Sequence, residues 1–137
     1  MLLNIDPLLH ADLLHALRSM GHNDTIVVAD GNFPANALGE KVVRIDGADA
    51  PRVVRAILSV MPVDNGEDPF IVMRSDAADG RDAVTIELET SAGRRAKLVT
   101  PTEFYELARK SFAIVQTGEQ RFYGNALLRK GVIAPKT

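Results

Sequence analysis

Three stretches of the sequence each contain a run of four apolar residues, and they constrain the fold more than any other feature. They are TIVVA at residues 25–29, FIVMRS at residues 70–75 and FAIVQT at residues 112–117. A strand with one face in water alternates apolar and polar side chains, whereas a strand covered on both faces is apolar throughout. Residues 25–29 are therefore predicted to form a central strand of a sheet, with a parallel neighbour.

Helical signals flank these strands. Asp6 precedes a proline and leucines at helical spacing, which predicts a helix that begins at this cap and ends at Gly21. Asp49 is predicted to cap a second helix that continues to about residue 60. Thr100 and Glu103 have the spacing of a capping box with a proline in the first turn, so another helix is predicted to begin there.

The remaining segments complete a predicted alternation of strands and helices. Residues 31–39 are rich in Gly, Asn and Pro and are predicted to form a loop, followed by a strand at residues 41–45. Residues 83–99 alternate in part around a Ser-Ala-Gly break and are interpreted as a hairpin, and residues 125–130 as a last short strand. The predicted fold is α/β, with residues 1–137 as a single-domain layered sandwich in which helices flank a mainly parallel sheet.

Composition excludes several classes of function. The 137 residues include 16 basic and 18 acidic side chains, so charge favours neither nucleic acid nor an anionic membrane as a partner. The chain has no cysteine, which rules out disulfides and thiolate zinc sites and suits a reducing compartment. The first twenty residues resemble no signal peptide, and no segment is apolar enough to span a membrane. The expected location is the cytoplasm.

Polar residues at strand ends and turns are the candidates for a site. Ligands of open α/β sheets bind beyond the carboxyl ends of the strands, and Asp30 directly follows residues 25–29. An aspartate before Gly31 also simply caps a turn, and His22, after a helix-ending glycine, is equally typical of a solvated position. The segment FYGN at residues 122–125 carries a phenol and a carboxamide around a glycine, with an ordinary turn as the alternative.

Metal and nucleotide chemistry find no support in the sequence. His10 and His15 lie five residues apart, which on a helix turns them about 140° away from each other, so they do not form a metal site. The glycine-rich phosphate-binding motifs, the dinucleotide motif and the nucleophile elbow are all absent. Acid–base chemistry is what remains.

Three ordered segments resemble one known family. MGHNDTIVVADGNFPANALG, VVRIDG and EFYELARKSFAIVQTGEQRFYGNALLRKGV are similar, in order and spacing, to the ribose pyranase and L-fucose mutarotase family. The G-H-x-D, F-P-A and Y-G-N motifs are closer to the fucose branch. The resemblance extends over nearly the whole chain, and residues 76–99 are the part that differs in length and pattern.

The resemblance implies a cofactor-free enzyme that interconverts the anomers or ring forms of a free monosaccharide. It also implies an α/β protein assembled into homo-oligomeric rings, commonly decamers, in which a neighbouring subunit completes each pocket. His22 matches the family's catalytic histidine and Asp30 its sugar-binding aspartate. Tyr123, Gly124 and Asn125 match the C-terminal sugar-binding segment. A histidine exchanges protons in both directions near neutral pH, so His22 is expected to act as the acid–base catalyst and Tyr123 as its partner or as an orienting ligand.

One position departs from the family pattern. Family members carry an arginine or histidine as a sugar ligand where this chain has Pro101, and proline offers no side-chain donor. Arg94, Arg95 and Lys97 are candidates to replace that ligand. A non-catalytic sugar-binding or transport-associated protein is the alternative function, and a purely structural ring protein is a third.

Overall fold

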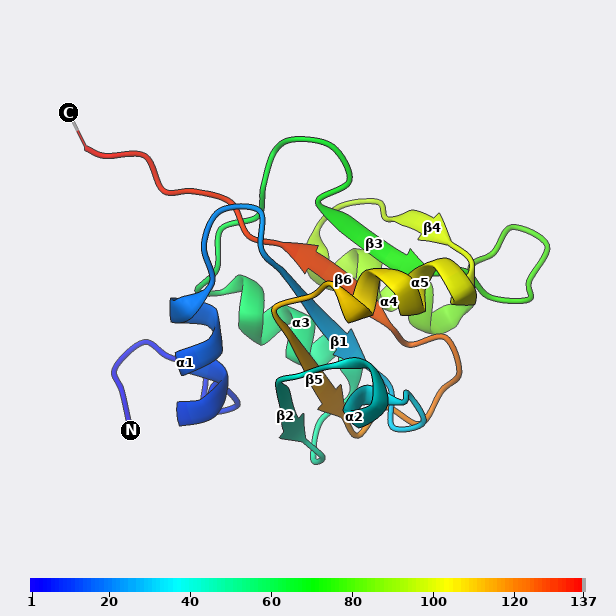
Figure 1. Ribbon diagram of the computed structural model, residues 1–137, viewed down its shortest axis with the longest axis horizontal. Helices are drawn as coiled ribbons and strands as arrows, with labels where there is room; N and C mark the ends of the chain where they lie inside the picture. Colours follow the sequence, from blue (N-terminus) through cyan, green and yellow to red (C-terminus); the bar gives the residue numbers. More distant parts are fainter. Residues whose placement is uncertain (137) are drawn as a thin grey trace.

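The computed structural model describes residues 1–136, which form six strands and five helices (Figure 1). The strands are β1 (Thr25–Ala29), β2 (Val42–Ile45), β3 (Phe70–Met73), β4 (Lys97–Val99), β5 (Ala113–Thr117) and β6 (Ala126–Arg129). The helices are α1 (Ala11–Ser19), α2 (Ala35–Leu38), α3 (Ala50–Leu58), α4 (Ala83–Ala92) and α5 (Pro101–Arg109).

The strands form one sheet in the order β2-β5-β1-β6-β3-β4. β1 pairs in parallel with β5 on one side and antiparallel with β6 on the other, and β3 also pairs antiparallel with β6. The pairs β2–β5 and β3–β4 are parallel. The predicted mainly parallel sheet is therefore confirmed, with β1 in its interior and β6 as the one reversed strand among the described residues.

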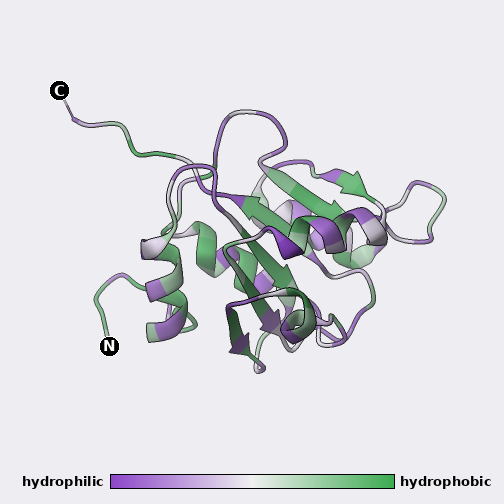
Figure 2. Cartoon of the chain, viewed as in Figure 1, coloured by the Kyte–Doolittle hydropathy of each residue, from purple (hydrophilic) through white to green (hydrophobic). Residues whose placement is uncertain are grey.

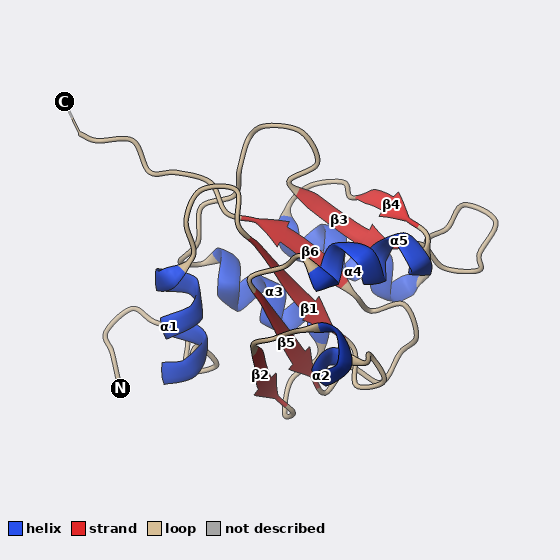
Figure 3. Cartoon of the chain, in the orientation of Figure 1, coloured by secondary structure: helices blue, strands red, loops and turns tan. Residues whose placement is uncertain are grey.

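Helices cover both faces of this sheet, which makes the molecule a three-layer sandwich (Figure 3). One core packs α1, α3 and α4 against one face, and the other packs α2 and α5 against the opposite face. Successive side chains of a strand point to opposite faces, so Val28 belongs to the first core and Val27 to the second. The apolar colour of β1 along its length in Figure 2 reflects this double coverage.

Two of the predicted helix caps are confirmed. The Asp49 carboxylate accepts a hydrogen bond of 2.9 Å from the Arg52 backbone N–H at the start of α3. The Thr100 hydroxyl accepts one of 3.2 Å from the Glu103 backbone N–H at the start of α5. These caps satisfy backbone donors that have no partner within the helix.

The first helix begins later than predicted. α1 starts at Ala11 with His10 as its N-cap, whose Nδ1 accepts from the Leu13 backbone N–H. The Asp6 carboxylate instead accepts from the Leu8 backbone N–H and forms an ion pair with Arg52. The predicted loop at residues 31–39 also contains the four-residue helix α2.

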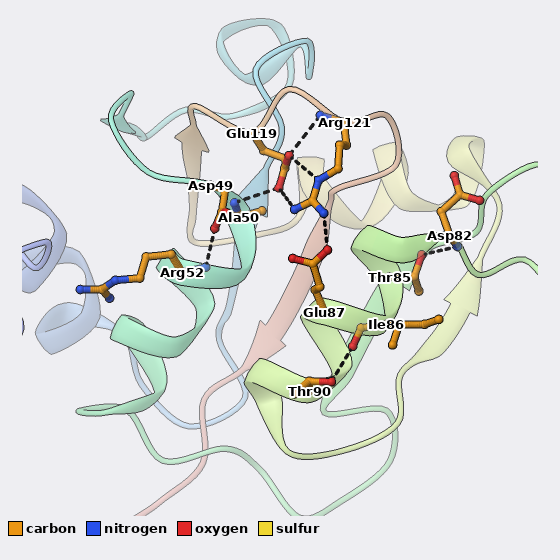
Figure 4. Close-up of polar contacts among 10 residues, drawn as sticks. All are labelled: Asp49, Ala50, Arg52, Asp82, Thr85, Ile86, Glu87, Thr90, Glu119 and Arg121. Atoms are coloured by element: carbon orange, nitrogen blue, oxygen red, sulfur yellow. Dashed lines mark hydrogen bonds and ion pairs between the residues drawn. The ribbon is translucent and has the colours of Figure 1, made fainter.

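The predicted hairpin at residues 83–99 is wrong, because this segment contains α4 followed by β4. The Asp82 backbone N–H donates to the Thr85 hydroxyl over 3.1 Å, which fixes the start of a helix (Figure 4). Gly93 adopts a left-handed conformation with φ 67° and ends that helix. The Ser-Ala-Gly sequence that resembled a hairpin turn is therefore the end of a helix.

No helix in residues 1–136 is long and apolar enough to cross a membrane.

Candidate active site

A pocket of about 380 Å³ opens at the carboxyl ends of β1 and β3. Its lining combines polar, aromatic and aliphatic side chains from four segments: Asp30, Asn32, Phe33, Met73, Pro101, Tyr105, Phe122, Tyr123 and Asn125. This edge of the sheet is where open α/β proteins bind ligands, because the loops that follow parallel strands gather there. The reversed direction of β6 brings Asn125, which precedes that strand, to the same edge.

Asp30 and Asn125 form a buried pair at this pocket. The Asp30 backbone N–H donates to Asn125 Oδ1 over 2.8 Å, and Asn125 Nδ2 donates to Asp30 Oδ2 over 3.0 Å. Asp30 Oδ1 accepts from the Asn32 backbone N–H over 2.9 Å. Burial raises the pKa of Asp30 above its ordinary value, and the bonds from Asn32 and Asn125 oppose that rise. The structure thus brings together two of the residues predicted from the sequence.

Tyr123 reaches the same pocket from a left-handed backbone conformation with φ 65°. This conformation is unfavourable for a residue with a Cβ atom, and such residues occur where the surrounding structure fixes them. The nearby Asp76 carboxylate raises the pKa of the Tyr123 phenol. Tyr123 is therefore neutral, and its hydroxyl can both donate and accept a hydrogen bond.

Gly124 does not line the pocket, and position 124 requires glycine because a side chain has no space there. A Cβ atom at position 124 would lie 2.7 Å from Glu119 Cγ and 3.3 Å from Val84 Cγ2. Real Cβ atoms do not approach other carbons to 2.7 Å, so the chain can pass between Glu119 and Val84 at this point only without a side chain. Gly124 fixes the path that leads from Tyr123 to Asn125.

His22 lies at the other end of β1. It is separated from Asp30 by residues 23–29, which include β1, and at a rise of about 3.3 Å per residue this strand alone is roughly 16 Å long. The His22 Nε2 atom lies 3.0 Å from the Asp64 Oδ1 atom, and about half of the His22 side chain is exposed. The pKa of Asp64 is lowered by its hydrogen bond with His22. The structure therefore places His22 outside the pocket that Asp30 lines in the same chain.

The basic residues expected to replace the ligand missing at Pro101 also lie elsewhere. Pro101 lines the pocket as predicted, but Arg94, Arg95 and Lys97 do not. Lys97 lies at the start of β4 and forms an ion pair of 3.0 Å with Asp68. No basic side chain is among the described residues that line the pocket.

Tyr105 is one of the pocket residues that the sequence reasoning missed, together with Asn32, Phe33 and Met73. It lies four residues after Pro101 on α5, and its ring packs against Phe33 with centroids 5.5 Å apart. Residues four apart share one face of a helix, so the spacing from Pro101 was the signal that could have found it. The pocket therefore holds two phenol groups, Tyr105 and Tyr123.

Comparison with known proteins assigns the chain to a family. The RbsD / FucU transport protein family matches residues 3–133. The chain belongs to this family. Among its relatives is the fucose mutarotase of Homo sapiens, 41% identical over 143 residues that cover 95% of this chain and 93% of the relative. The fucose mutarotase of Bos taurus is 39% identical over 144 residues, which cover 96% of this chain and 94% of the relative.

A solved structure of an RbsD / FucU relative shares the fold. The fucose mutarotase of Streptococcus pneumoniae, determined in complex with L-fucose, superposes with a TM-score of 0.84 and 32% sequence identity. The match covers 97% of this chain and all of that one. The layered sandwich described above is thus a fold of this family.

Proposed function

We propose that this RbsD / FucU family member is a monosaccharide mutarotase, which interconverts the α and β anomers of a free sugar, L-fucose or a related one. The observation that carries the proposal is the buried Asp30–Asn125 pair beside two phenols in one pocket. The relatives named fucose mutarotase, each about 40% identical over nearly their full length, support the same reaction.

The pocket suits a neutral sugar. A carboxylate accepts hydrogen bonds from two neighbouring hydroxyls, and a carboxamide both donates and accepts, so Asp30 and Asn125 together can fix a sugar ring. The lining has no basic side chain to pair with a phosphate or carboxylate group, and Asp30 would repel one. Phe33 and Tyr105 add apolar surface for the C–H faces of the ring.

The reaction needs two proton transfers. Opening the cyclic hemiacetal takes a proton from the anomeric hydroxyl and gives one to the ring oxygen, and closing reverses both transfers. Tyr105 and Tyr123 are the pocket's own proton carriers, and one positioned donor contributes about 10²–10⁴-fold. Histidine is the side chain type best suited to proton exchange in both directions near neutral pH, so we propose His22 as the acid–base group.

His22 would reach the pocket from a second copy of the chain. In our proposal the protein forms a homo-oligomeric ring, a decamer as the family resemblance implies, in which one copy supplies Asp30, Tyr123 and Asn125 and its neighbour supplies His22. The distance between the two ends of β1 supports this arrangement, because one chain cannot present both groups to one sugar. The cytoplasmic location expected from the sequence stays a prediction.

Magnetisation exchange between α and β anomers tests the proposed reaction. L-fucose, D-ribose and D-galactose are compared by NMR saturation transfer with and without protein, and acceleration for at least one of them is expected. Sugar binding without acceleration would favour the alternative of a non-catalytic sugar-binding protein.

Mixing two inactive variants tests the shared pocket. His22→Ala and Asp30→Ala chains are each expected to lose most of the acceleration. When they are unfolded together and reassembled, about one quarter of the pockets in a random mixture combine an intact His22 with an intact Asp30. Activity should therefore reappear in the mixture. A mixture as inactive as its components, with a normal oligomer size, would refute the shared pocket.

A further inference from the structure

Glu119 is a buried carboxylate that the proposed reaction does not use. Its side chain is 3% exposed, and it does not line the pocket. Burying a charge is costly unless hydrogen bonds and an opposite charge compensate it. The partners of Glu119 therefore indicate what the residue does.

Arg121 is the first of these partners. Its Nε atom donates to Glu119 Oε2 over 3.0 Å and its Nη2 atom to Oε1 over 2.9 Å, which is the two-point geometry of a strong arginine–carboxylate pair. The Arg121 backbone N–H donates to Oε2 over 3.1 Å. Burial acts to raise the pKa of Glu119, but these bonds outweigh it, and the pKa lies below its ordinary value. Glu119 is thus ionised, and it binds both the side chain and the backbone of Arg121.

Two helices, α3 and α4, contact this ion pair, as Figure 4 shows. The backbone N–H of Ala50, the first residue of α3, donates to Glu119 Oε1 over 3.3 Å, at the end of the helix that attracts negative charge. Arg121 also forms an ion pair with Glu87 of α4. The loop that follows β5 therefore forms polar contacts with the helical layer that contains α3 and α4.

Glu119 also lies against the two segments that carry Asp30 and Tyr123. Its backbone carbonyl accepts a hydrogen bond of 2.8 Å from the N–H of Gly31, the residue after Asp30. Its Cγ atom is the group that would lie 2.7 Å from a Cβ atom at position 124, directly after Tyr123. The residue lies between the segment that carries Asp30 and the segment that carries Tyr123 and Asn125.

The geometry points to Glu119 as a positioning residue: with Arg121, it holds residues 120–125 in the path that turns Tyr123 and Asn125 towards the sugar. This inference rests on the proposed mutarotase function for its kinetic consequence, although its structural consequence can be measured without a sugar. Tyr123 adopts an unfavourable backbone conformation, so it depends on its surroundings to stay there.

The substitution Glu119→Gln tests this role, with Glu89→Gln as its matched control. Glu89 is also a nearly buried carboxylate that binds an arginine, Arg81, at two points and accepts from the backbone N–H of Ala96. Neither Glu89 nor its partners Arg81 and Ala96 line the pocket. Both variants remove a paired charge of the same kind, so both should lower the melting temperature, and only Glu119→Gln should alter the pocket.

Kinetics and hydrogen exchange give separate results. In anomer exchange, Glu119→Gln is expected to raise KM and to lower kcat/KM by about tenfold to hundredfold, since small displacements of positioned groups have effects of that size. A merely destabilised protein would lose kcat in proportion to the unfolded fraction and keep its KM. By mass spectrometry, amides of residues 120–125 should exchange faster in Glu119→Gln and at the wild-type rate in Glu89→Gln.

The inference would be overturned if Glu119→Gln keeps the wild-type KM and if the amides of residues 120–125 exchange hydrogen at the wild-type rate. If the wild-type protein accelerates anomer exchange of none of the sugars, the proposed function fails. The amide hydrogen-exchange measurement still decides whether Glu119 positions residues 120–125. If Glu119→Gln does not fold, Arg121→Lys serves as the second variant, because lysine keeps the charge but cannot make the two-point contact. Arg121→Lys should speed amide hydrogen exchange at residues 120–125, and an unchanged rate would again overturn the inference.

Discussion

Replacing Asn125 by alanine should destabilise the folded protein, because Asp30 then loses two hydrogen-bond partners in the interior. The change removes the two hydrogen bonds, of 2.8 and 3.0 Å, that join Asn125 to Asp30. Both partner atoms belong to a residue that is only 4% exposed, so they remain buried without these bonds. A buried polar group left unsatisfied costs about 1–3 kcal/mol, and two such groups predict a loss of roughly 2–6 kcal/mol. That is a large share of the about 5–15 kcal/mol that stabilises a typical domain.

Urea unfolding at one fixed protein concentration measures this loss, and Asn32→Ala is the control. Asn32 also lines the pocket, but it donates to Asp30 through its backbone N–H, which alanine keeps. The control should stay within about 0.5 kcal/mol of wild type. A loss below about 1 kcal/mol for Asn125→Ala, with an unchanged slope on denaturant, would refute the reasoning.

The pH dependence gives a second check on the same variant. The pKa of Asp30 is raised in the folded protein, so its ionisation lowers stability as pH rises through the folded pKa. Without the Asn125 donor this pKa should rise further. The destabilisation by Asn125→Ala should therefore be larger at pH 7 than near pH 4, and an equal loss at both values would contradict the assigned hydrogen bond.

Three further changes have distinct expected outcomes. His22→Ala should abolish most of the anomer-exchange acceleration while the circular dichroism spectrum stays that of the wild type, and near wild-type exchange rates would remove His22 from the mechanism. Gly124→Ala should destabilise by about 1–3 kcal/mol through its contact with Glu119, whereas Gly47→Ala, with nothing within 4 Å, should be nearly neutral in thermal unfolding. Pro101→Arg should tighten L-fucose binding in calorimetry by placing a donor in the pocket wall, and an unchanged or weaker affinity would show that this position is not a sugar contact.

The buried strands could be predicted because their sequence signal is local. Residues 25–29 are apolar at consecutive positions, and the observed β1 has the two-sided coverage that such a run requires. α4 could not be recognised in the same way. Its apolar residues alternate in part, as in a strand, and the contacts that fix it as a helix are the Thr85 bond to Asp82 and the left-handed Gly93. Tertiary packing on α3 outweighs the ambiguous pattern.

In the candidate site, too, some features could be predicted from the sequence and others could not. Asp30 and Asn125 are 95 positions apart, and only the direction of β6 determines whether they meet. Strand-end and turn positions made both residues candidates, the family resemblance related them to a sugar site, and the fold shows why they belong together. The separation of His22 from the Asp30 pocket could not be predicted, because a local sequence pattern does not state where the loop before a strand lies relative to a pocket.

The reversal of β6 also decides where the end of the chain goes. Since this strand starts beside Asp30 and runs back, it delivers Lys130 to the opposite edge, where its backbone carbonyl accepts from the N–H of Asn23, next to His22. Residues 131–136 continue outward from that edge (Figure 1). An affinity tag or fluorescent label attached there lies at the His22 edge of the sheet and away from Asp30, so it is expected to interfere with the proposed approach of His22 to a neighbouring copy.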